Sequence, residues 1–415
     1  MKQYNLGIEV LNMKVLQINL VYGIGSTGKI VKDINDVLIE NSHESIAAYG
    51  YYDSNERNAI KIKKGTSKYS VYLELMLTRL SGYHGFTSKS ATKKLLGIIT
   101  EQKPDIIHLH NIHGGYLNIE ILFKALKNID IPIVWTLHDC WSFTGHCSHF
   151  DFIECDKWKK ECHSCTNLSS YPKSYLFDCS KVQYNKKKEL FTGVKKLQII
   201  TPSDWLADRV KESFLKNYDI KKISNGVDLE LFRPKESMFR ETNGLNNKII
   251  ILGVSSTWNH KKGLFDMIKL SQMLDSRFQV VMVGLNKRQM RIIPDNILGI
   301  ERTNNMEELV EIYSTADIFV NASVEETMGL TTAEAMACGT PVIVYNKTAV
   351  PECVDDTCGR VVRQNTPENI LDEITNMLPV IDDLKENTRA KVIKHYDKWK
   401  QYNQYYDIYK ELYHK

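Results

Sequence analysis

The fold of this chain is decided by Glu326-Thr-Met-Gly-Leu-Thr-Thr-Ala-Glu334, which runs on to Thr340-Pro-Val-Ile-Val-Tyr345. The first part predicts a Gly-bearing turn that opens an Ala- and Met-rich helix, and the second part predicts a buried strand. Glu326 then precedes the helix and Glu334 lies inside it. Helix N-termini suit phosphates and carboxylates suit hydroxyl groups, so the combination favours a sugar joined to a diphosphate. Two glutamates at this spacing also occur by chance on solvated helices. The surrounding sequence must therefore show whether this pair belongs to a binding site.

Short β-branched runs alternate with longer amphipathic stretches along the whole chain. We expect two series of strands, namely Val15–Leu20, Ser45–Gly50, Asp105–His110, Ile131–His138 and Leu197–Thr201, then Ile249–Val254, Gln279–Val283, Ile318–Asn321 and Pro341–Tyr345. Continuous apolar strands separated by helices predict parallel sheets that are covered on both faces. The fold class is therefore α/β, with two doubly wound, Rossmann-like domains. Their ligands are expected in the cleft between the domains, beyond the carboxyl ends of the strands.

Several further motifs occur in a fixed order around these strands. They are Ser224-Asn-Gly-Val-Asp228, Leu231-Phe-Arg-Pro234, Gly253-Val-Ser-Ser-Thr-Trp-Asn-His-Lys-Lys-Gly263, Val280-Val-Met-Val-Gly284, Ala316-Asp-Ile-Phe-Val-Asn321 and Val350-Pro-Glu352. Taken together they resemble the family-4 retaining glycosyltransferases, which are nucleotide-sugar enzymes of the two-domain GT-B fold. The resemblance implies a hexosyltransferase-type enzyme. Such an enzyme moves a sugar from a nucleotide-diphosphate donor to a glycan or polyprenyl-linked acceptor in surface polysaccharide synthesis, as for capsule, exopolysaccharide or lipopolysaccharide.

A chain of 415 residues is too long for one compact core, which favours two domains. We expect an N-terminal extension over residues 1–12, an acceptor-side domain over 13–232 and a nucleotide-sugar-binding domain over 233–391. The tail, 392–415, repeats aromatic residues at helical intervals and therefore needs burial. In the GT-B resemblance, this tail is the last helix that crosses back to the first domain.

The resemblance also assigns roles around the donor. Lys262 matches the lysine that neutralises the leaving diphosphate, and Glu334 is expected to bind the ribose hydroxyls. The other expected donor contacts are Lys261, Gly329, Leu330 and Thr331. The family usually has an arginine five residues before Lys262, where this chain has Thr257. Lys261, Arg233 or another residue is expected to supply the second positive charge.

The loop Gly23-Ile-Gly-Ser-Thr-Gly-Lys29 follows the first predicted strand and opens a helix. It matches neither the dinucleotide nor the nucleoside-triphosphate fingerprint, yet a Gly-rich loop here is a good anion cradle. The resemblance makes Gly25 and Gly28 plausible donor contacts, while Gly23 is as readily a structural turn.

A polar side chain at the end of a buried strand is expected to reach the cleft, and His138 ends such a strand. The family has a histidine at this position that contacts the transferred sugar, so we assign His138 to the sugar together with Glu326. His110 and His113 end the preceding strand and compete for that role.

Six of the nine cysteines lie between Cys140 and Cys179, a stretch that we interpret as a Cys-rich insert. Cys162-His-Ser-Cys165 has the spacing of a zinc knuckle, and Cys147 with Cys155 would complete four thiolates. A structural zinc and free buried thiols both remain open. Disulfides would need an oxidising compartment, of which the chain shows no sign.

Composition and charge narrow the remaining classes. The chain has 43% apolar and 25% charged residues, a net charge of +4 and no signal-peptide pattern, so we expect a cytoplasmic protein. Two groups of lysines beside apolar residues suggest peripheral contact with the inner membrane. They are Lys89, Lys93 and Lys94 near Leu95 and Leu96, and Lys186 to Lys188 near Leu190 and Phe191. The alternative is that these lysines form solvated helix faces whose leucines point inward.

Two other functions compete with glycosyl transfer. An epimerase or oxidoreductase on doubly wound sheets lacks support because the chain has no Gly-x-Gly-x-x-Gly motif. A zinc-containing module that binds nucleic acid lacks support because the predicted isoelectric point, about 8.4, is too low. For the same reason we expect no nucleic-acid partner. No Asp-x-Asp pair occurs where a metal–nucleotide site would be, so we also expect no catalytic metal.

Overall fold

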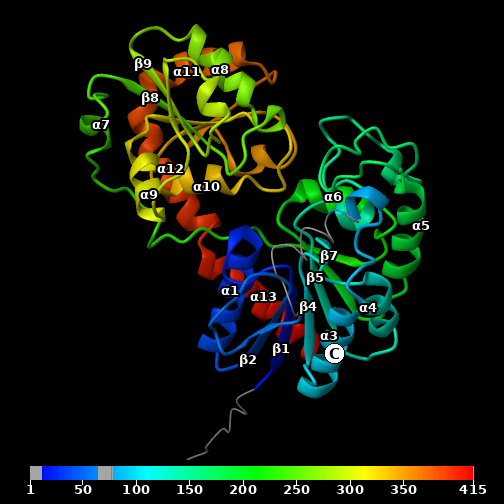
Figure 1. The fold of residues 1–415 in the computed structure, drawn as a ribbon. Helices are drawn as coiled ribbons and strands as arrows, with labels where there is room; N and C mark the ends of the chain where they lie inside the picture. Colours follow the sequence, from blue (N-terminus) through cyan, green and yellow to red (C-terminus); the bar gives the residue numbers. More distant parts are fainter. Residues whose placement is uncertain (1–11, 64–75, 77, 415) are drawn as a thin grey trace, which may run out of the picture.

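The structure, a computed structural model, describes residues 12–63, 76 and 78–414. The chain folds into two α/β domains, each built around one parallel sheet (Figure 1). The predicted class of two doubly wound domains is thereby confirmed. The N-terminal extension predicted over residues 1–12 lies, except for residue 12, outside the described residues.

The first domain contains a seven-stranded sheet in the order β3-β2-β1-β4-β5-β6-β7, with every pairing parallel. Its strands are β1 (Lys14–Asn19), β2 (Glu44–Tyr49), β3 (Ala59–Lys61), β4 (Ile106–Leu109), β5 (Ile133–Thr136), β6 (Leu197–Thr201) and β7 (Asp219–Lys222). The helices between them are α1 (Gly25–Glu40), α3 (Lys89–Gln102), α4 (Ile119–Leu126), α5 (Ser180–Phe191) and α6 (Asp204–Glu212).

The second domain contains a six-stranded parallel sheet in the order β10-β9-β8-β11-β12-β13. Its strands are β8 (Ile249–Val254), β9 (Phe278–Val283), β10 (Ile297–Ile300), β11 (Ile318–Asn321), β12 (Val342–Val344) and β13 (Gly359–Val361). Its helices are α7 (Phe239–Thr242), α8 (Leu264–Met273), α9 (Met306–Thr315), α10 (Leu330–Ala337), α11 (Pro367–Met377) and α12 (Ile381–His395).

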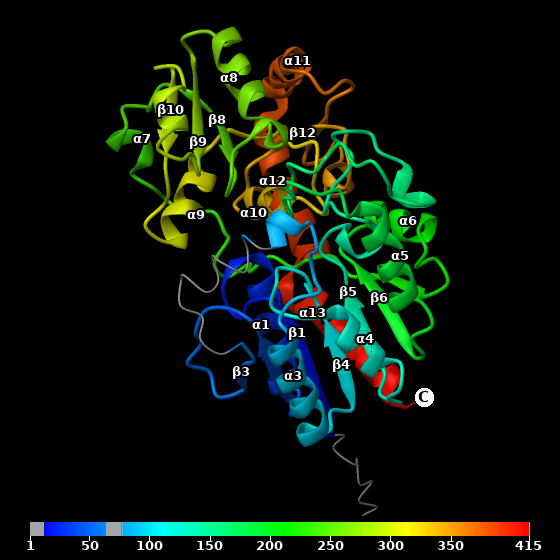
Figure 2. The ribbon, with the colours of Figure 1, turned by 45° about the vertical axis from the view of Figure 1, so that its right-hand side comes forward.

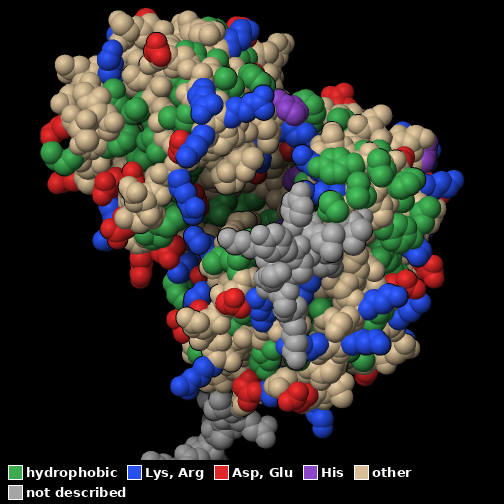
Figure 3. Space-filling view, in the orientation of Figure 1, with side chains coloured by type: hydrophobic (Ala, Val, Ile, Leu, Met, Phe, Trp, Pro, Cys, Tyr) green, Lys and Arg blue, Asp and Glu red, His purple; other side chains and the backbone are tan. Residues whose placement is uncertain are grey.

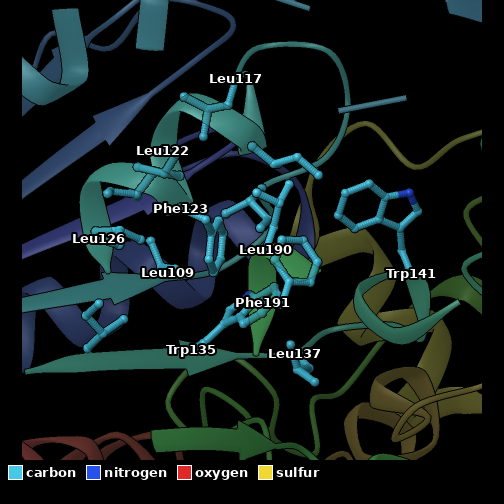
Figure 4. Close-up of a cluster of buried hydrophobic side chains, with 14 of the residues drawn as sticks. Leu109, Leu117, Leu122, Phe123, Leu126, Trp135, Leu137, Trp141, Leu190 and Phe191 are labelled. Carbon is cyan, nitrogen blue, oxygen red and sulfur yellow. The ribbon is translucent and has the colours of Figure 1, made fainter. Parts of the chain in front are cut away.

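Alternating side chains of the first sheet build two cores, one on each face. In β1, Leu16 and Ile18 join the core beneath α3 and α4, whereas Val15 joins the core beneath α1 and the last helix. Figure 4 shows the first core, where Phe123 of α4 lies against Phe191 at the end of α5 with ring centroids 4.4 Å apart. Burial on both faces explains why these strands are continuously apolar.

The last helix, α13 (Lys398–Tyr413), leaves the second domain and packs against α1 of the first (Figures 1 and 2). Tyr402, Tyr405 and Tyr409 are fully buried there. The Thr136 hydroxyl donates a hydrogen bond to the Tyr405 hydroxyl at 3.2 Å, and the Tyr409 hydroxyl lies 2.6 Å from His108 Nδ1. These hydrogen bonds satisfy hydroxyl groups that would otherwise be costly to bury.

The lysine-rich helices do not present the apolar surface expected for membrane contact. Leu95 of α3 and Leu190 and Phe191 of α5 are buried in the core of the first domain. Lys187 is also buried, and its Nζ donates to the Trp141 and Thr144 carbonyl oxygens at 2.8 and 3.1 Å. Of the four apolar residues in the predicted pairs only Leu96 is partly exposed, so these helices offer little apolar surface for membrane contact. No helix in the described part of the chain is long and apolar enough to cross a membrane.

Candidate functional site

Helix α10 begins at the carboxyl edge of the second sheet, directly beyond β11. Its N-cap is Gly329, whose φ of 83° is a left-handed conformation that suits glycine. The Asn321 side chain at the end of β11 donates a hydrogen bond to the Thr332 hydroxyl at 2.9 Å and so fixes the first turn of the helix. The first N–H groups of a helix have no partner within it, so the N–H groups of Leu330 and Thr331 are free to donate to an anion.

Glu334 lies one turn into α10 and is held in a desolvated position. Burial raises the pKa of this carboxyl group to about 7, while the Tyr313 hydroxyl and the charge of Lys29 act in the opposite direction. The Tyr313 hydroxyl lies 3.2 Å from Glu334 Oε2. Because Lys29 belongs to α1 in the first domain, its influence brings the Gly-rich loop to within electrostatic range of α10. A carboxylate beside a helix N-terminus can accept hydrogen bonds from sugar hydroxyls.

Lys262 and Glu326 form an ion pair at the same edge of the sheet. Lys262 Nζ lies 2.6 Å from Glu326 Oε1 and 2.9 Å from the Glu325 carbonyl oxygen. Lys261 Nζ lies 2.9 Å from Glu325 Oε2 in a parallel pair. Both side chains of the Lys262–Glu326 pair are partly exposed, so an anionic ligand can compete for the lysine.

The turn that carries the two lysines is built by its neighbours. The Asn259 side chain accepts hydrogen bonds from the backbone N–H groups of Lys261 and Lys262, at 2.8 and 3.2 Å. Gly263 follows with φ of 75°, and a side chain there would lie 2.5 Å from Ala322 Cβ. The turn therefore approaches the end of β11 closely, which places Lys262 beside Glu326.

His138 lies just beyond β5 and is partly exposed, whereas His110 and His113 are buried. His110 Nδ1 lies 3.2 Å from His138 Nε2, and His113 Nε2 lies 2.9 Å from Asp139 Oδ2. Burial lowers the pKa of His138 to about 4, against the opposing charge of Asp139, so its ring is neutral at pH 7. Of the three candidates, His138 alone retains an accessible surface for a ligand.

The residues after Glu326 connect His138 to the second domain. The Thr327 hydroxyl donates a hydrogen bond to the His138 carbonyl oxygen at 3.1 Å. The Phe152 backbone N–H, in the Cys-rich insert, donates to Glu325 Oε1 at 3.1 Å, and Lys261 Nζ lies 3.2 Å from the Ser170 hydroxyl. The insert thus rests on the lysine turn. Figure 3 shows the hollow between the two domains, with Lys and Arg side chains along its edge on the side of the second domain.

The other sequence-predicted residues differ in their surroundings. Gly25 is exposed at the start of α1, with φ of 64° and open space around its Cα. Gly28 is buried, and its Cα faces the Val21 side chain and backbone of the loop itself. Thr257 is exposed, and Arg233 lies within electrostatic range of Arg389. Lys261 is therefore the second cation that the structure brings to Lys262.

Sequence reasoning missed Glu325, Thr327, Phe152, Ser170 and Lys29. Glu325 is 4% exposed and pairs with Lys261, although it stands next to Glu326 in the sequence. Its adjacency to a predicted site residue was the one available signal. Thr327 and Lys29 stand within quoted motifs, but they and Phe152 and Ser170 reach the site through contacts between domains, which no local pattern encodes.

Comparisons with known proteins identify the family of the chain. The family described as "Glycosyl transferases group 1" matches residues 235–399, and "Glycosyltransferase Family 4" matches residues 68–231. The "Putative colanic acid biosynthesis glycosyl transferase WcaC" of Escherichia coli strain K12 is 24% identical over 367 residues, which is 85% of this chain and 88% of that protein.

Solved structures share the fold. Sucrose-phosphate synthase from Thermosynechococcus elongatus superposes with a TM-score of 0.71 at 16% identity, covering 97% of this chain and 99% of that one. Anabaena Alr3699/HepE, solved in complex with UDP-glucose, superposes with a TM-score of 0.66 at 14% identity, covering 96% of this chain and 100% of that one. Two family matches that together span most of the chain, with GT-B neighbours, replace the epimerase, oxidoreductase and binding-module alternatives. The chain belongs to the family-4 glycosyltransferases of the GT-B fold.

Proposed function

We propose that this enzyme is a retaining glycosyltransferase that uses a nucleoside diphosphate sugar and extends a glycan or polyprenyl-linked acceptor of a surface polysaccharide. The observation that carries the proposal is the convergence of Lys262, Glu326 and the N-terminus of α10 at one edge of the second sheet, where Lys262 Nζ and Glu326 Oε1 are 2.6 Å apart. The named function of the E. coli relative supports the polysaccharide context.

Each group has a defined part in the proposed reaction. The diphosphate lies on the N–H groups of Leu330 and Thr331 and draws Lys262 away from Glu326, and Lys261 adds a second positive charge. Glu334 accepts hydrogen bonds from the ribose. Glu326, released from its lysine, and the neutral His138 hydrogen-bond the transferred sugar.

The bond between the anomeric carbon and the phosphate oxygen breaks while the acceptor oxygen forms a bond to the same carbon. The acceptor proton passes to the departing phosphate, so no side chain is needed as the base. The protein then contributes position and electrostatics. This handling of the diphosphate needs no divalent cation, because lysines and the helix N-terminus neutralise the leaving group.

A thermal-shift screen against UDP-, GDP- and ADP-sugars tests the donor proposal. A ligand at 100 times its dissociation constant stabilises the folded protein by about 2.7 kcal/mol. We expect one nucleotide series to raise the melting temperature of the wild type and not that of Lys262→Ala. If no nucleotide sugar does so, and none is consumed with added glycan acceptors, the proposal is wrong.

We further propose that contact with a lipid-linked acceptor is made through an exposed apolar loop and not through the lysine helices. Tyr175, Leu176 and Phe177 are 57%, 67% and 60% exposed in succession. The loop precedes α5, and the exposed Lys173 and Lys181 flank it on either side. Apolar side chains among basic ones suit an anionic bilayer surface. The enzyme would then work as a cytoplasmic protein that touches the inner membrane face peripherally.

A further inference from the structure

Four cysteines of the insert line one small, partly open cavity, although the chain brings them from positions spread over nineteen residues. The cavity has about 20 Å³ of free space, and its walls include Cys147, Cys155, Cys162 and Cys165. A space of this size accepts about one atom or ion as large as a water molecule. The remaining two cysteines of the insert, Cys140 and Cys179, do not line it.

Local backbone structure directs the Cys162–Cys165 pair into this cavity. Ser164, between them, has φ of 43°, a left-handed conformation that turns the chain tightly. The Gly145 backbone N–H donates a hydrogen bond to Cys162 Sγ at 3.2 Å. A side chain at Gly145 would lie 2.7 Å from Cys162 Cβ, so this approach depends on glycine. Hydrogen bonds from N–H groups favour sulfur in its thiolate form.

The cavity walls also contain buried polar atoms without partners. His146 Nε2, Trp158 Nε1 and Ser180 Oγ have no hydrogen-bond partner in the described part of the chain. All three residues line the cavity and are at most 3% exposed. Buried polar groups are rarely left unsatisfied in folded proteins, and the indole N–H can only donate, so a neighbouring sulfur in its thiolate form would suit it as an acceptor.

A buried lysine lies close by, and burial lowers the pKa of its amino group to about 7. Lys187 is fully buried on α5 and is hydrogen-bonded to the carbonyl oxygen of Thr144, a residue that also lines the cavity. No carboxylate lies within ion-pair distance of its Nζ among residues 12–63 and 78–414. A zinc ion with four thiolates carries two net negative charges, which a neighbouring ammonium group would partly offset.

We propose that Cys147, Cys155, Cys162 and Cys165 bind one structural zinc ion as thiolates. Within the described residues no three His, Cys, Asp or Glu side chains stand as an assembled metal site, so the sulfurs must move inward to about 2.3 Å from the ion. All nine cysteines are free in the structure, which leaves these four available. The zinc would brace the insert whose Phe152 contacts Glu325 beside the donor lysines.

Metal analysis of the full-length, tag-free protein tests this inference without any substrate. We expect about one equivalent of zinc per chain, and visible absorption bands of tetrahedral cobalt thiolate after exchange with Co²⁺. Cys162→Ser and Cys165→Ser should each lose most of the zinc. Cys179→Ser is the matched control and should keep it, because Cys179 belongs to the same insert but lies outside the cavity.

The wild-type measurements keep the inference falsifiable if the cysteine variants do not fold. Less than about a tenth of an equivalent of zinc, with no cobalt thiolate bands after anaerobic reconstitution of the reduced protein, overturns it. Stoichiometric iron in place of zinc overturns it equally, as does full zinc retention in the Cys162→Ser, Cys165→Ser double variant. These outcomes are independent of whether the protein transfers a sugar.

Discussion

Replacement of Glu334 by glutamine should stabilise the free enzyme at high pH while weakening donor binding. Burial raises the pKa of Glu334 from 4.5 to about 7. The folded state therefore favours the neutral carboxyl group. Ionising this group costs more free energy in the folded state than in the unfolded chain, so ionisation lowers the free energy of unfolding. The shift of about 2.5 units corresponds to roughly 3 kcal/mol. Glutamine keeps the shape and the hydrogen bond with Tyr313 but has no charge to desolvate.

The sign of the effect depends on pH. The destabilisation of wild type by this group is absent below pH 4.5, grows as the pH rises, and is complete above pH 7. We therefore expect the melting temperature of Glu334→Gln to equal that of wild type near pH 4.5 and to exceed it by several degrees at pH 8. Scanning calorimetry at intervals between pH 4.5 and 8 measures the difference.

Donor binding should respond in the opposite direction. In the proposed donor complex the ionised carboxylate accepts hydrogen bonds from the ribose hydroxyls. Near pH 6 only about a tenth of the free enzyme has this carboxylate ionised, so wild-type affinity should fall about tenfold between pH 8 and pH 6. The glutamine variant should bind weakly at both. Glu236→Gln, at an exposed carboxylate of the same domain, is the matched control. A melting-temperature difference that is the same at every pH would refute the desolvation argument.

The remaining predictions concern the phosphate site and the apolar loop. Lys262→Ala should lower turnover by roughly 10²- to 10³-fold in a steady-state assay with an unchanged melting temperature, and near-native turnover would exclude its role. Turnover should survive EDTA at zinc-retaining concentrations; a loss reversed by Mg²⁺ or Mn²⁺ would contradict metal-free transfer. Gly329→Ala should weaken donor binding and lower the free energy of unfolding by about 1–2 kcal/mol. Gly244 is an exposed left-handed glycine outside the site, so Gly244→Ala should lower the free energy of unfolding without changing donor binding. The wild-type protein should sediment with anionic liposomes and not with neutral ones. The double variant Leu176→Glu, Phe177→Glu should sediment with neither type. Equal sedimentation of the two proteins with anionic liposomes would show that the loop does not bind lipid.

The central strands and the phosphate-binding helix could be predicted because burial on both faces leaves a strong local signal. The strands over Leu197–Thr201, Ile249–Val254 and Ile318–Asn321 have the expected bounds, and the others differ by one or two residues at their ends. β3 and β7 were not predicted because they are short edge strands without a buried residue, and β7 is mostly polar. β10 and β13 were missed because each is a short edge strand that contains a glycine.

The α5 helix shows a signal that was present and not used. Within its Lys186-Lys-Lys188 run, Lys187 alone is buried. Gln183, Tyr184, Leu190 and Phe191 are buried on the same face, at the three- and four-residue spacing of a helix. Composition makes the three lysines equivalent, whereas helical periodicity separates Lys187 from its neighbours. The prediction of a basic membrane surface on this helix did not take this periodicity into account.

The site itself depends on contacts that only the folded chain supplies. Glu325 pairs with Lys261 through Oε2 and accepts the Phe152 backbone N–H through Oε1. One carboxylate therefore joins the lysine turn of the second domain to the Cys-rich insert of the first domain. A diphosphate that attracts Lys261 would compete with Glu325 and loosen this junction. Both lysines are paired with glutamates in the free protein, so the proposed donor binding would exchange carboxylate for phosphate at each lysine and would not need unpaired cations in the cleft.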